Sequence, residues 1–303
     1  MASVDFEKIV DELSQELPLE QNAKSVESTK LPSIKALGEL VSLVRSVVFP
    51  GFFDERPAES CVQRHYLGVD INNIYNILQK QVARGLQFSY GVSDKDAHSQ
   101  AQYISEQFIQ SISKIKHLLF TDVTAMAHND PAVRNLGEVI FCYPVVQALV
   151  NYRIAHELHV LKVPIIPRII TEMAHSATGI DIHPGAVIGD HFCIDHGTGV
   201  VIGETCIIGS HVMLYQGVTL GAKNFSYDDS GHPLNVPRHP ILEDNVTVYS
   251  NASVLGRITI GHDSVIGGNV WVTNSVAPYT HVLQSKTKLM KNMDFLKDTD
   301  YMI

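Results

Sequence analysis

A repeat of six residues in the second half of the chain constrains the fold more than any other sequence feature. A second small or branched residue follows most of the repeated aliphatic positions four places later, as at Ala186, Thr198 and Cys206. Neither an α-helix nor an alternating strand has this period, whereas a parallel β-helix stacks short strands and turns with it. The repeated aliphatic positions are Ile182, Ile188, Ile194, Ile202, Ile208, Leu214, Leu220, Leu242, Val248, Val254, Ile260, Ile266 and Val272.

The repeat is interrupted in two places. Two extra residues enter between Ile194 and Ile202, in the segment Asp195-His196-Gly197-Thr198-Gly199. A longer polar segment with glycine and proline, residues 222–240, must leave the coil as a loop and ends in Arg238-His239-Pro240. Insertions in a solenoid map to loops that often carry function, so both interruptions are candidate functional segments.

The first half has a different period, with apolar residues recurring every three or four positions as in amphipathic helices. We therefore predict an α+β protein: an all-α domain over residues 1–172, a left-handed parallel β-helix over 173–280 and a C-terminal tail over 281–303. Within the helical part, an acidic helix is expected near residues 4–17. Asp130-Pro131 is typical of a helix N-cap followed by proline, and the last helix is expected to end before Pro164.

Composition excludes several classes of function. The formal charge of −9, without a basic block beyond Lys286, Lys288 and Lys291, argues against a nucleic-acid partner. The most apolar stretch, residues 139–150, is too short to span a membrane, and the N-terminus has no secretory pattern. The cysteines lack metal-type spacing and are interpreted as free thiols of a cytoplasmic protein; they are Cys61, Cys142, Cys193 and Cys206.

His196 is the candidate general base. It lies between Asp195 and Gly197 in the first interruption, and a hydroxyl needs such a base before it can attack a thioester. A structural histidine is the alternative interpretation. A carboxylate that orients this imidazole is expected, and Asp181 and Asp195 are the nearby choices. Cys206 occupies an inward and Cys193 an outward repeat position, so neither is expected to carry an acyl group, and direct transfer is favoured.

Arg238 and His239 close the second interruption. The guanidinium of Arg238 can bind a carboxylate with two parallel hydrogen bonds, as a free amino acid would require. His239 could donate a hydrogen bond to an oxyanion or contact a substrate side chain. A solvated loop arginine and a turn histidine are the alternatives.

Several ordered motifs together resemble the serine acetyltransferase family. The resemblance covers roughly residues 125–280. These motifs are Asp181-Ile182-His183-Pro184-Gly185-Ala186, the segment from Ile194 to Thr205, Gln216-Gly217-Val218-Thr219-Leu220-Gly221, and Arg238-His239-Pro240. The resemblance implies transfer of an acetyl group from acetyl-coenzyme A to L-serine in the first step of cysteine biosynthesis.

The resemblance also implies roles for individual residues. His196 would be the base and Asp181 its orienting partner. Asp130 and Asp195 would bind the substrate ammonium, Arg238 its carboxylate, and His239 would lie at its side chain. Acetyl-coenzyme A is expected as a co-substrate rather than a resident cofactor, near Gly221, Ala222, Ser250 and Gly268. No metal site is expected.

Assembly and partners follow from the same resemblance. The family forms trimers, which helical domains often pair into hexamers, with active sites between subunits. L-Cysteine is expected to inhibit at the serine site. The C-terminal residue Ile303 matches the family's contact to O-acetylserine sulfhydrylase.

The chain departs from the family in Gly221-Ala222, which replaces the usual Gly-Gly, in a longer loop before Arg238, and in Leu283-Gln284-Ser285-Lys286 at the end of the solenoid. Other functions stay open at this point. They are an acetyltransferase for a sugar or a modified serine, a zinc enzyme like the gamma-class carbonic anhydrases with His196 and His239 among its ligands, and an inactive scaffold.

Overall fold

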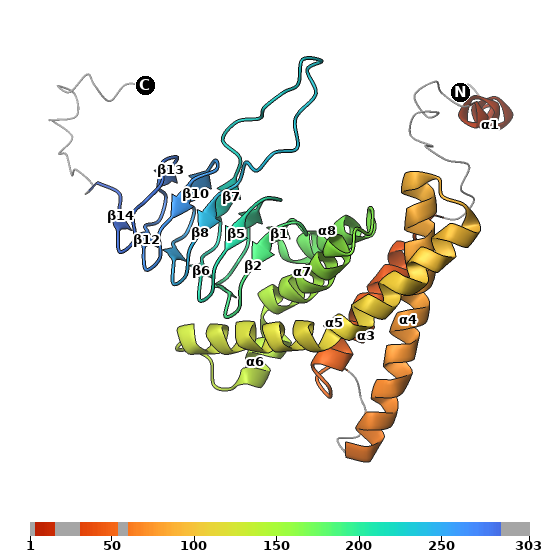
Figure 1. The fold of residues 1–303 in the computed structure, drawn as a ribbon, viewed down its shortest axis with the longest axis horizontal. Helices are drawn as coiled ribbons and strands as arrows, with labels where there is room; N and C mark the ends of the chain where they lie inside the picture. The colour runs from red at the N-terminus through yellow and green to blue at the C-terminus, as the bar shows by residue number, and fades with distance from the viewer. Residues whose placement is uncertain (1–3, 16–30, 54–59, 286–303) are drawn as a thin grey trace.

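A helical part precedes a β-helix in the computed structural model, which describes residues 4–15, 31–53 and 60–285 (Figure 1). The β-helix tapers away from the helices, and the loop between β7 and β8 projects from its upper side in this view. Helices of the described part are α1 (Phe6–Ser14), α3 (Ile34–Val48), α4 (Ser60–Tyr90), α5 (Asp94–Asn129), α6 (Leu136–Cys142), α7 (Pro144–Val160) and α8 (Ile166–Thr178).

Three parallel sheets form the walls of the β-helix. Their strand orders are β1-β4-β7-β10-β13, β11-β8-β5-β2 and β14-β12-β9-β6-β3, so consecutive strands always lie in different sheets. The strands are β1 (Asp181–Ile182), β2 (Val187–Ile188), β3 (Cys193–Ile194), β4 (Val201–Ile202), β5 (Ile207–Ile208), β6 (Met213–Leu214), β7 (Thr219–Gly221), β8 (Ile241–Leu242), β9 (Thr247–Val248), β10 (Ser253–Leu255), β11 (Thr259–Ile260), β12 (Val265–Ile266), β13 (Trp271–Val272) and β14 (His281–Val282).

The aliphatic residues of the six-residue pattern fill the interior of this coil. Ile182 pairs with Ile202, and Ile202 with Leu220, so equivalent side chains stack from one turn to the next. Thr198 does not face inward as the pattern suggests, because the two extra residues shift the register. Val200 is fully buried in its place. The continuous apolar column explains why the coil needs no other core.

The helical part buries its own apolar stripes. Leu37, Leu40 and Val44 of α3 and Phe108 and Ile115 of α5 are fully buried, which confirms both predicted helices. α1 agrees with the expected acidic helix. No helix among residues 4–15, 31–53 and 60–285 is long and apolar enough to cross a membrane.

One helix was not expected. α7 ends before Pro164 as predicted, but α8 follows it and carries Pro167 in its first turn, where proline costs no hydrogen bond. α8 ends at Gly179, whose left-handed backbone (φ 70°) leads into β1. The change from helix to strand therefore falls at residues 179–180, whereas the sequence placed it at 172–173.

A buried ion pair joins the two parts. Arg153 of α7 donates to both oxygens of Asp122 of α5 at 3.0–3.2 Å, and to the carbonyls of Ile188 and Gly189 at 2.7 Å. Asp122 also accepts the backbone N–H of Phe192 at 3.0 Å. Burial raises the pKa of Asp122 to about 6, although the guanidinium of Arg153 acts in the opposite direction. The pair thus fixes the turn that leads into β3.

Candidate active site

His196 lies in a tight turn between β3 and β4. Its backbone is left-handed (φ 57°), as are Gly197 (φ 85°) and Gly199 (φ 78°), and only glycine adopts this conformation freely. A Cβ on Gly197 would stand 2.6 Å from Cδ1 of Ile180, so another residue would strain the backbone and displace the Ile180 side chain. The N–H of Gly199 donates to the carbonyl of Gly179 at 2.8 Å. The turn is thus held against the segment that precedes Asp181, and the His196 side chain is 70% exposed.

Two of the predicted carboxylates lie beside His196. An oxygen of Asp195 is 3.6 Å from its Nδ1. Asp130 comes from the end of α5 and is close enough for the positive charge of a protonated His196 to lower its pKa. Asp130, Asp195 and His196 therefore group at one edge of the β-helix. Their spacing along the sequence could not show this grouping.

Asp130 does not begin a helix, as Asp130-Pro131 seemed to indicate. It ends α5 instead, and α6 starts only at Leu136. Its Oδ1 accepts the N–H of Ala132 at 2.8 Å, which is an aspartate turn rather than a helix cap. The Asp130-Pro131 pattern thus predicted a side-chain hydrogen bond of Asp130 correctly, but the helix that it predicted to begin there is absent.

Tyr143, between α6 and α7, is a site residue that the sequence analysis missed. Its hydroxyl donates to Oδ2 of Asp130. This bond, followed by the N–H of Ala132, lowers the pKa of Asp130, while the same contact raises the pKa of Tyr143 to about 12. Asp130 is thus held ionised beside His196. No sequence signal places Tyr143 there, because a turn between two helices brings it back.

Asp181, the other predicted partner of His196, starts β1. Its one ion pair within the described ranges is to Arg168 of α8, at 3.9 Å, and no contact to the imidazole of His196 is formed. The two residues lie on adjoining turns, since the His196 turn packs on Ile180 and Gly179. The orienting role of Asp181 stays a prediction.

Arg238 and His239 are held by Thr205. The Thr205 hydroxyl accepts both of their backbone N–H groups, at 2.9 and 3.0 Å. Nδ1 of His239 accepts the N–H of Thr205 at 3.1 Å, which assigns the ring proton to Nε2. Arg238 donates to Glu204 at 2.6 Å and to Asn235 at 3.3 Å. Glu204 and Thr205 stand in the motif that resembles the family, so this motif was the signal for their role.

His239 is neutral at neutral pH. It is 7% exposed, and burial followed by the charge of Arg238 lowers its pKa to about 4. Its ring packs on Gly203, where a Cβ would stand 2.2 Å from Nε2. A neutral imidazole with its proton on Nε2 can donate one hydrogen bond to a substrate.

The two groups of predicted residues lie at opposite edges of one sheet. His196 precedes β4, whereas Glu204 and Thr205, which hold Arg238 and His239, follow it. No hydrogen bond or ion pair joins the groups within the described chain. The predicted site residues of one chain therefore form two separate groups, which we call half-sites.

The predicted coenzyme residues flank the same sheet. Gly221 ends β7 and pairs with Leu255 of β10, and Ala222 follows it at the start of the loop. Ser250 and Gly268 lie in the turns before β10 and β13, and a Cβ on Gly268 would be 3.2 Å from the carbonyl of Ser250. A pocket of about 270 Å³ opens beside Gly221, with Lys223, Arg238 and Arg257 among its lining residues.

The cysteines do not form an acyl-carrying site in the described structure. Cys193 points out of the coil but is buried, because α5 packs over β3. Burial raises the pKa of Cys193 and of Cys206 to about 12, so both stay as thiols. Cys142 is a free exposed thiol, and the side chain of Cys61 lies outside the described residues.

The zinc alternative has no geometric basis in one chain. Zinc enzymes need converging protein ligands. Neither His196 nor His239 belongs to a group of three ligand-type side chains within the described residues.

Comparison with known proteins gives consistent relatives. The chain is 42% identical over 292 residues to a protein of Synechococcus elongatus named "Serine acetyltransferase, plasmid", a match that covers 93% of this chain and 92% of the relative. Among solved structures, Entamoeba histolytica serine acetyltransferase 1 in complex with L-cysteine is 32% identical with a TM-score of 0.71, covering 91% of this chain and 95% of the other. Isoform 3 from the same organism, in complex with cysteine, is 29% identical with a TM-score of 0.71 and covers 95% and 94%. No family model matches the chain.

Proposed function

The chain belongs to the serine acetyltransferase family, and from this we propose that it acetylates the hydroxyl of L-serine with acetyl-coenzyme A as donor and His196 as general base. The convergence of Asp130, Asp195 and His196 at one edge of the β-helix carries this proposal, because it pairs a base with two anions suited to an ammonium group. A sugar acceptor has no positive charge for those carboxylates.

The reaction proceeds by direct transfer. Nδ1 of His196 faces Asp195, which leaves Nε2 for the substrate. Nε2 takes the proton of the serine hydroxyl while the oxygen attacks the thioester carbonyl carbon. The tetrahedral intermediate collapses with loss of the coenzyme A thiolate, which receives the proton from the imidazolium. The high pKa values of Cys193 and Cys206 support the absence of an acyl-enzyme.

Substrate recognition needs both half-sites. The serine ammonium lies between Asp130 and Asp195, its carboxylate pairs with Arg238, and Nε2 of His239 donates to the substrate. Arg238 and His239 stand at the opposite edge of the sheet from His196, so they come from a neighbouring chain. This supports a trimer, or a hexamer of two trimers, with one site at each interface.

The coenzyme runs along the sheet that Gly221, Ala222, Ser250 and Gly268 flank. Backbone groups of these small residues are accessible to the pantetheine chain. Lys223 and Arg257 at the pocket beside Gly221 supply cations for phosphate groups. Residues of the long loop before Arg238 bound this pocket.

Regulation and partners extend the proposal. The similar Entamoeba histolytica protein was crystallised with L-cysteine, which differs from serine by one atom, and we expect cysteine to compete at the same site. Binding of O-acetylserine sulfhydrylase through Ile303 stays a proposal, since that residue lies outside the described ones. Free Cys142, Cys193 and Cys206 support a reducing compartment such as the cytoplasm.

The decisive test is release of thiol from acetyl-coenzyme A with L-serine, compared with D-serine, phosphoserine and galactoside acceptors. His196→Ala should lower kcat by about 10²–10⁴-fold, the range for loss of a general base. His232→Ala in the exposed loop is the matched control and should leave the rate unchanged. Faster release with another acceptor would refute serine as the substrate, and an undiminished His196→Ala rate would refute the base.

A further inference from the structure

A column of residues at one corner of the β-helix lies outside the proposed active site. At this corner the chain passes from sheet β11-β8-β5-β2 to sheet β14-β12-β9-β6-β3 through a left-handed residue in each turn. These corner residues are His191 (φ 52°), His211 (φ 57°), Asn245 (φ 60°) and Asp263 (φ 55°). Asparagine and aspartate are common in this conformation, and here histidine occupies the two turns nearest the helices.

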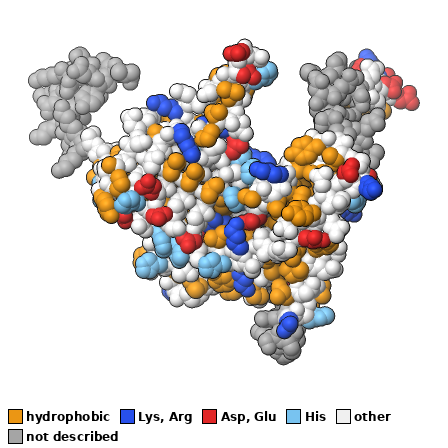
Figure 2. All heavy atoms as spheres, viewed as in Figure 1, with side chains coloured by type: hydrophobic (Ala, Val, Ile, Leu, Met, Phe, Trp, Pro, Cys, Tyr) orange, Lys and Arg blue, Asp and Glu red, His pale blue; other side chains and the backbone are white. Residues whose placement is uncertain are grey.

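The two histidines and an aspartate are close together. The imidazole rings of His191 and His211 stack with centroids 4.3 Å apart and an angle of 17°. Asp190 Oδ1 is 3.4 Å from Nδ1 of His191. One ligand atom from each of the three residues lies within 4.8 Å of the other two. Histidine side chains gather along this lower edge of the β-helix in Figure 2.

His191 has an unsatisfied nitrogen. Its Nδ1 is shielded from solvent and has no hydrogen-bond partner among the described residues, although a buried ring nitrogen normally has one. The nearest carboxylate oxygen to this nitrogen is Oδ1 of Asp190, at 3.4 Å. A shielded imidazole nitrogen, a carboxylate and a second imidazole together form a set of groups that a metal cation can bind.

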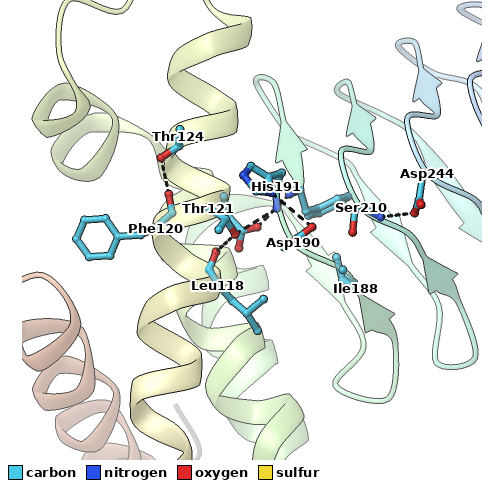
Figure 3. A network of polar contacts seen from close by, with 12 residues as sticks. Leu118, Phe120, Thr121, Thr124, Ile188, Asp190, His191, Ser210 and Asp244 are labelled. Carbon is cyan, nitrogen blue, oxygen red and sulfur yellow. Dashed lines mark hydrogen bonds and ion pairs between the residues drawn. The ribbon is translucent and has the colours of Figure 1, made fainter.

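The backbone around the cluster is held in place. The N–H of His191 donates to the Thr121 hydroxyl of α5 at 3.2 Å, and the N–H of His211 donates to the carbonyl of Asp190 at 3.1 Å. Figure 3 shows Thr121 on the helix facing His191, with Asp190, Ser210 and Asp244 on successive turns. The N–H of Ser210 in turn donates to Asp244 at 2.8 Å.

We propose that Asp190, His191 and His211 bind a divalent transition metal of the zinc class. Two imidazoles and one carboxylate are ligands that such ions prefer, and three protein ligands leave a position for water. Binding requires the stacked rings to tilt toward a common point. Within the described part of the chain, the one polar contact that the two rings form is that of His191 Nδ1 to Asp190, so both side chains can tilt. The ion would tie the first and second turns of the β-helix together next to α5.

The test is calorimetric titration of the metal-stripped full-length protein with Zn²⁺, together with the visible absorption of the Co²⁺ form, which reports nitrogen and oxygen coordination. One equivalent per chain is expected. His211→Asn should weaken binding by at least about 100-fold, beyond the usual loss for an outer-shell partner. This change keeps the fold, because Asn245 occupies the same corner position one turn further along.

Two further variants make the outcome decisive. Asp190→Asn should weaken Zn²⁺ binding similarly, whereas His262→Asn, at the same corner two turns further along, should not change it. A melting temperature that rises with Zn²⁺ in the wild type and in His262→Asn, but not in His211→Asn, would support the site. Absence of Zn²⁺ binding by the wild type, or equal binding by His211→Asn, would overturn it. None of these readouts depends on acetyl transfer.

Discussion

At the scale of single residues, the surroundings of His196 decide what each carboxylate does. Asp195 flanks Nδ1 of His196, Asp130 is fixed by Tyr143 and Ala132, and Asp181 faces Arg168. Three carboxylates in one small region therefore have three different sets of partners. Two of them suit the binding of an ammonium group, and the third adjoins the turn that carries the base.

Kinetics should separate the roles of Asp181 and Asp195. Asp181→Asn should lower kcat by up to about 10⁴-fold with little change in the KM for serine, as loss of an orienting carboxylate does. Asp195→Asn should mainly raise the KM for serine, because it removes a charge partner of the ammonium. Steady-state rates over a range of serine concentrations test this. The reverse pattern would assign the orienting role to Asp195, its neighbour in the chain.

His239 should make stability depend on pH. Its folded pKa of about 4 lies below the ordinary value of 6.5, so the unfolded chain binds the proton more readily. The contribution of neutral His239 to the free energy of unfolding is complete above pH 6.5 and is lost as the pH falls toward 4. The loss amounts to at most about 3.5 kcal/mol, at about 1.4 kcal/mol per pKa unit.

The comparison of wild type with His239→Asn isolates this contribution, because the asparagine oxygen can still accept the N–H of Thr205. Free energies of unfolding in denaturant at neutral pH and near pH 4 are the measurement. The wild type should lose more stability than the variant in this window. Equal losses in the two proteins would show that His239 titrates normally in the folded state.

At the scale of secondary-structure elements, α5 and α7 position the first turns of the β-helix. Asp122 and Arg153 bond to each other and to the backbone of residues 188, 189 and 192. The Thr121 hydroxyl of α5 accepts the backbone N–H of His191 in the same turn. This turn leads through β3 to Asp195 and His196, so helix packing and active-site geometry are linked by a short path.

Breaking this buried pair should be costly. Asp122→Ala leaves the Arg153 guanidinium buried without its partner and should lower the free energy of unfolding by about 3–5 kcal/mol. Replacing both, with Asp122→Leu and Arg153→Met, should cost less than the single change, since an apolar pair leaves no unpaired charge and only the backbone groups of residues 188, 189 and 192 lose a partner. Denaturant unfolding of the single and double variants tests this.

An exposed ion pair supplies the control. Lys114 is 61% exposed and pairs with Glu157, so Lys114→Ala should change stability by less than about 1 kcal/mol. A loss for Asp122→Ala no larger than that of Lys114→Ala would contradict the proposed role of the junction.

At the scale of the whole molecule, the two half-sites of the described chain lie apart, at opposite edges of one sheet. His196 stands before β4 and the Arg238 cluster after it, and the rigid sheet between them prevents their approach. A β-helix keeps this separation because every turn is bonded to the next. The proposed trimer would bring the two edges of neighbouring copies together, and cyclic symmetry would repeat the site at each interface.

Mixed assemblies should recover activity from inactive parents. Co-expression of His196→Ala with Arg238→Ala in equal amounts should restore about a quarter of the wild-type rate, since each intact site takes one half from each type of chain. A mixture of His196→Ala with Asp181→Asn, both in the same half-site, should show no such recovery. Absence of recovery in the first mixture would place the complete site within one chain.

The sequence alone determined the fold and much of the candidate site. The six-residue pattern requires stacked short turns, since no helix or sandwich buries residues at that spacing, and its two interruptions contain His196 and Arg238. Local patterns carry such information because each turn contacts only its neighbours.

Only the tertiary structure decided what depends on contacts between distant segments. It placed Asp130 at the end of α5 with Tyr143 beside it, added α8 after Pro164, and buried Cys193 under α5. It also brought His191 and His211 into one stack and kept His196 apart from Arg238. These features arise from packing between helices and coil and from the three-sided path of the chain, and neither is encoded in the spacing of residues along the sequence.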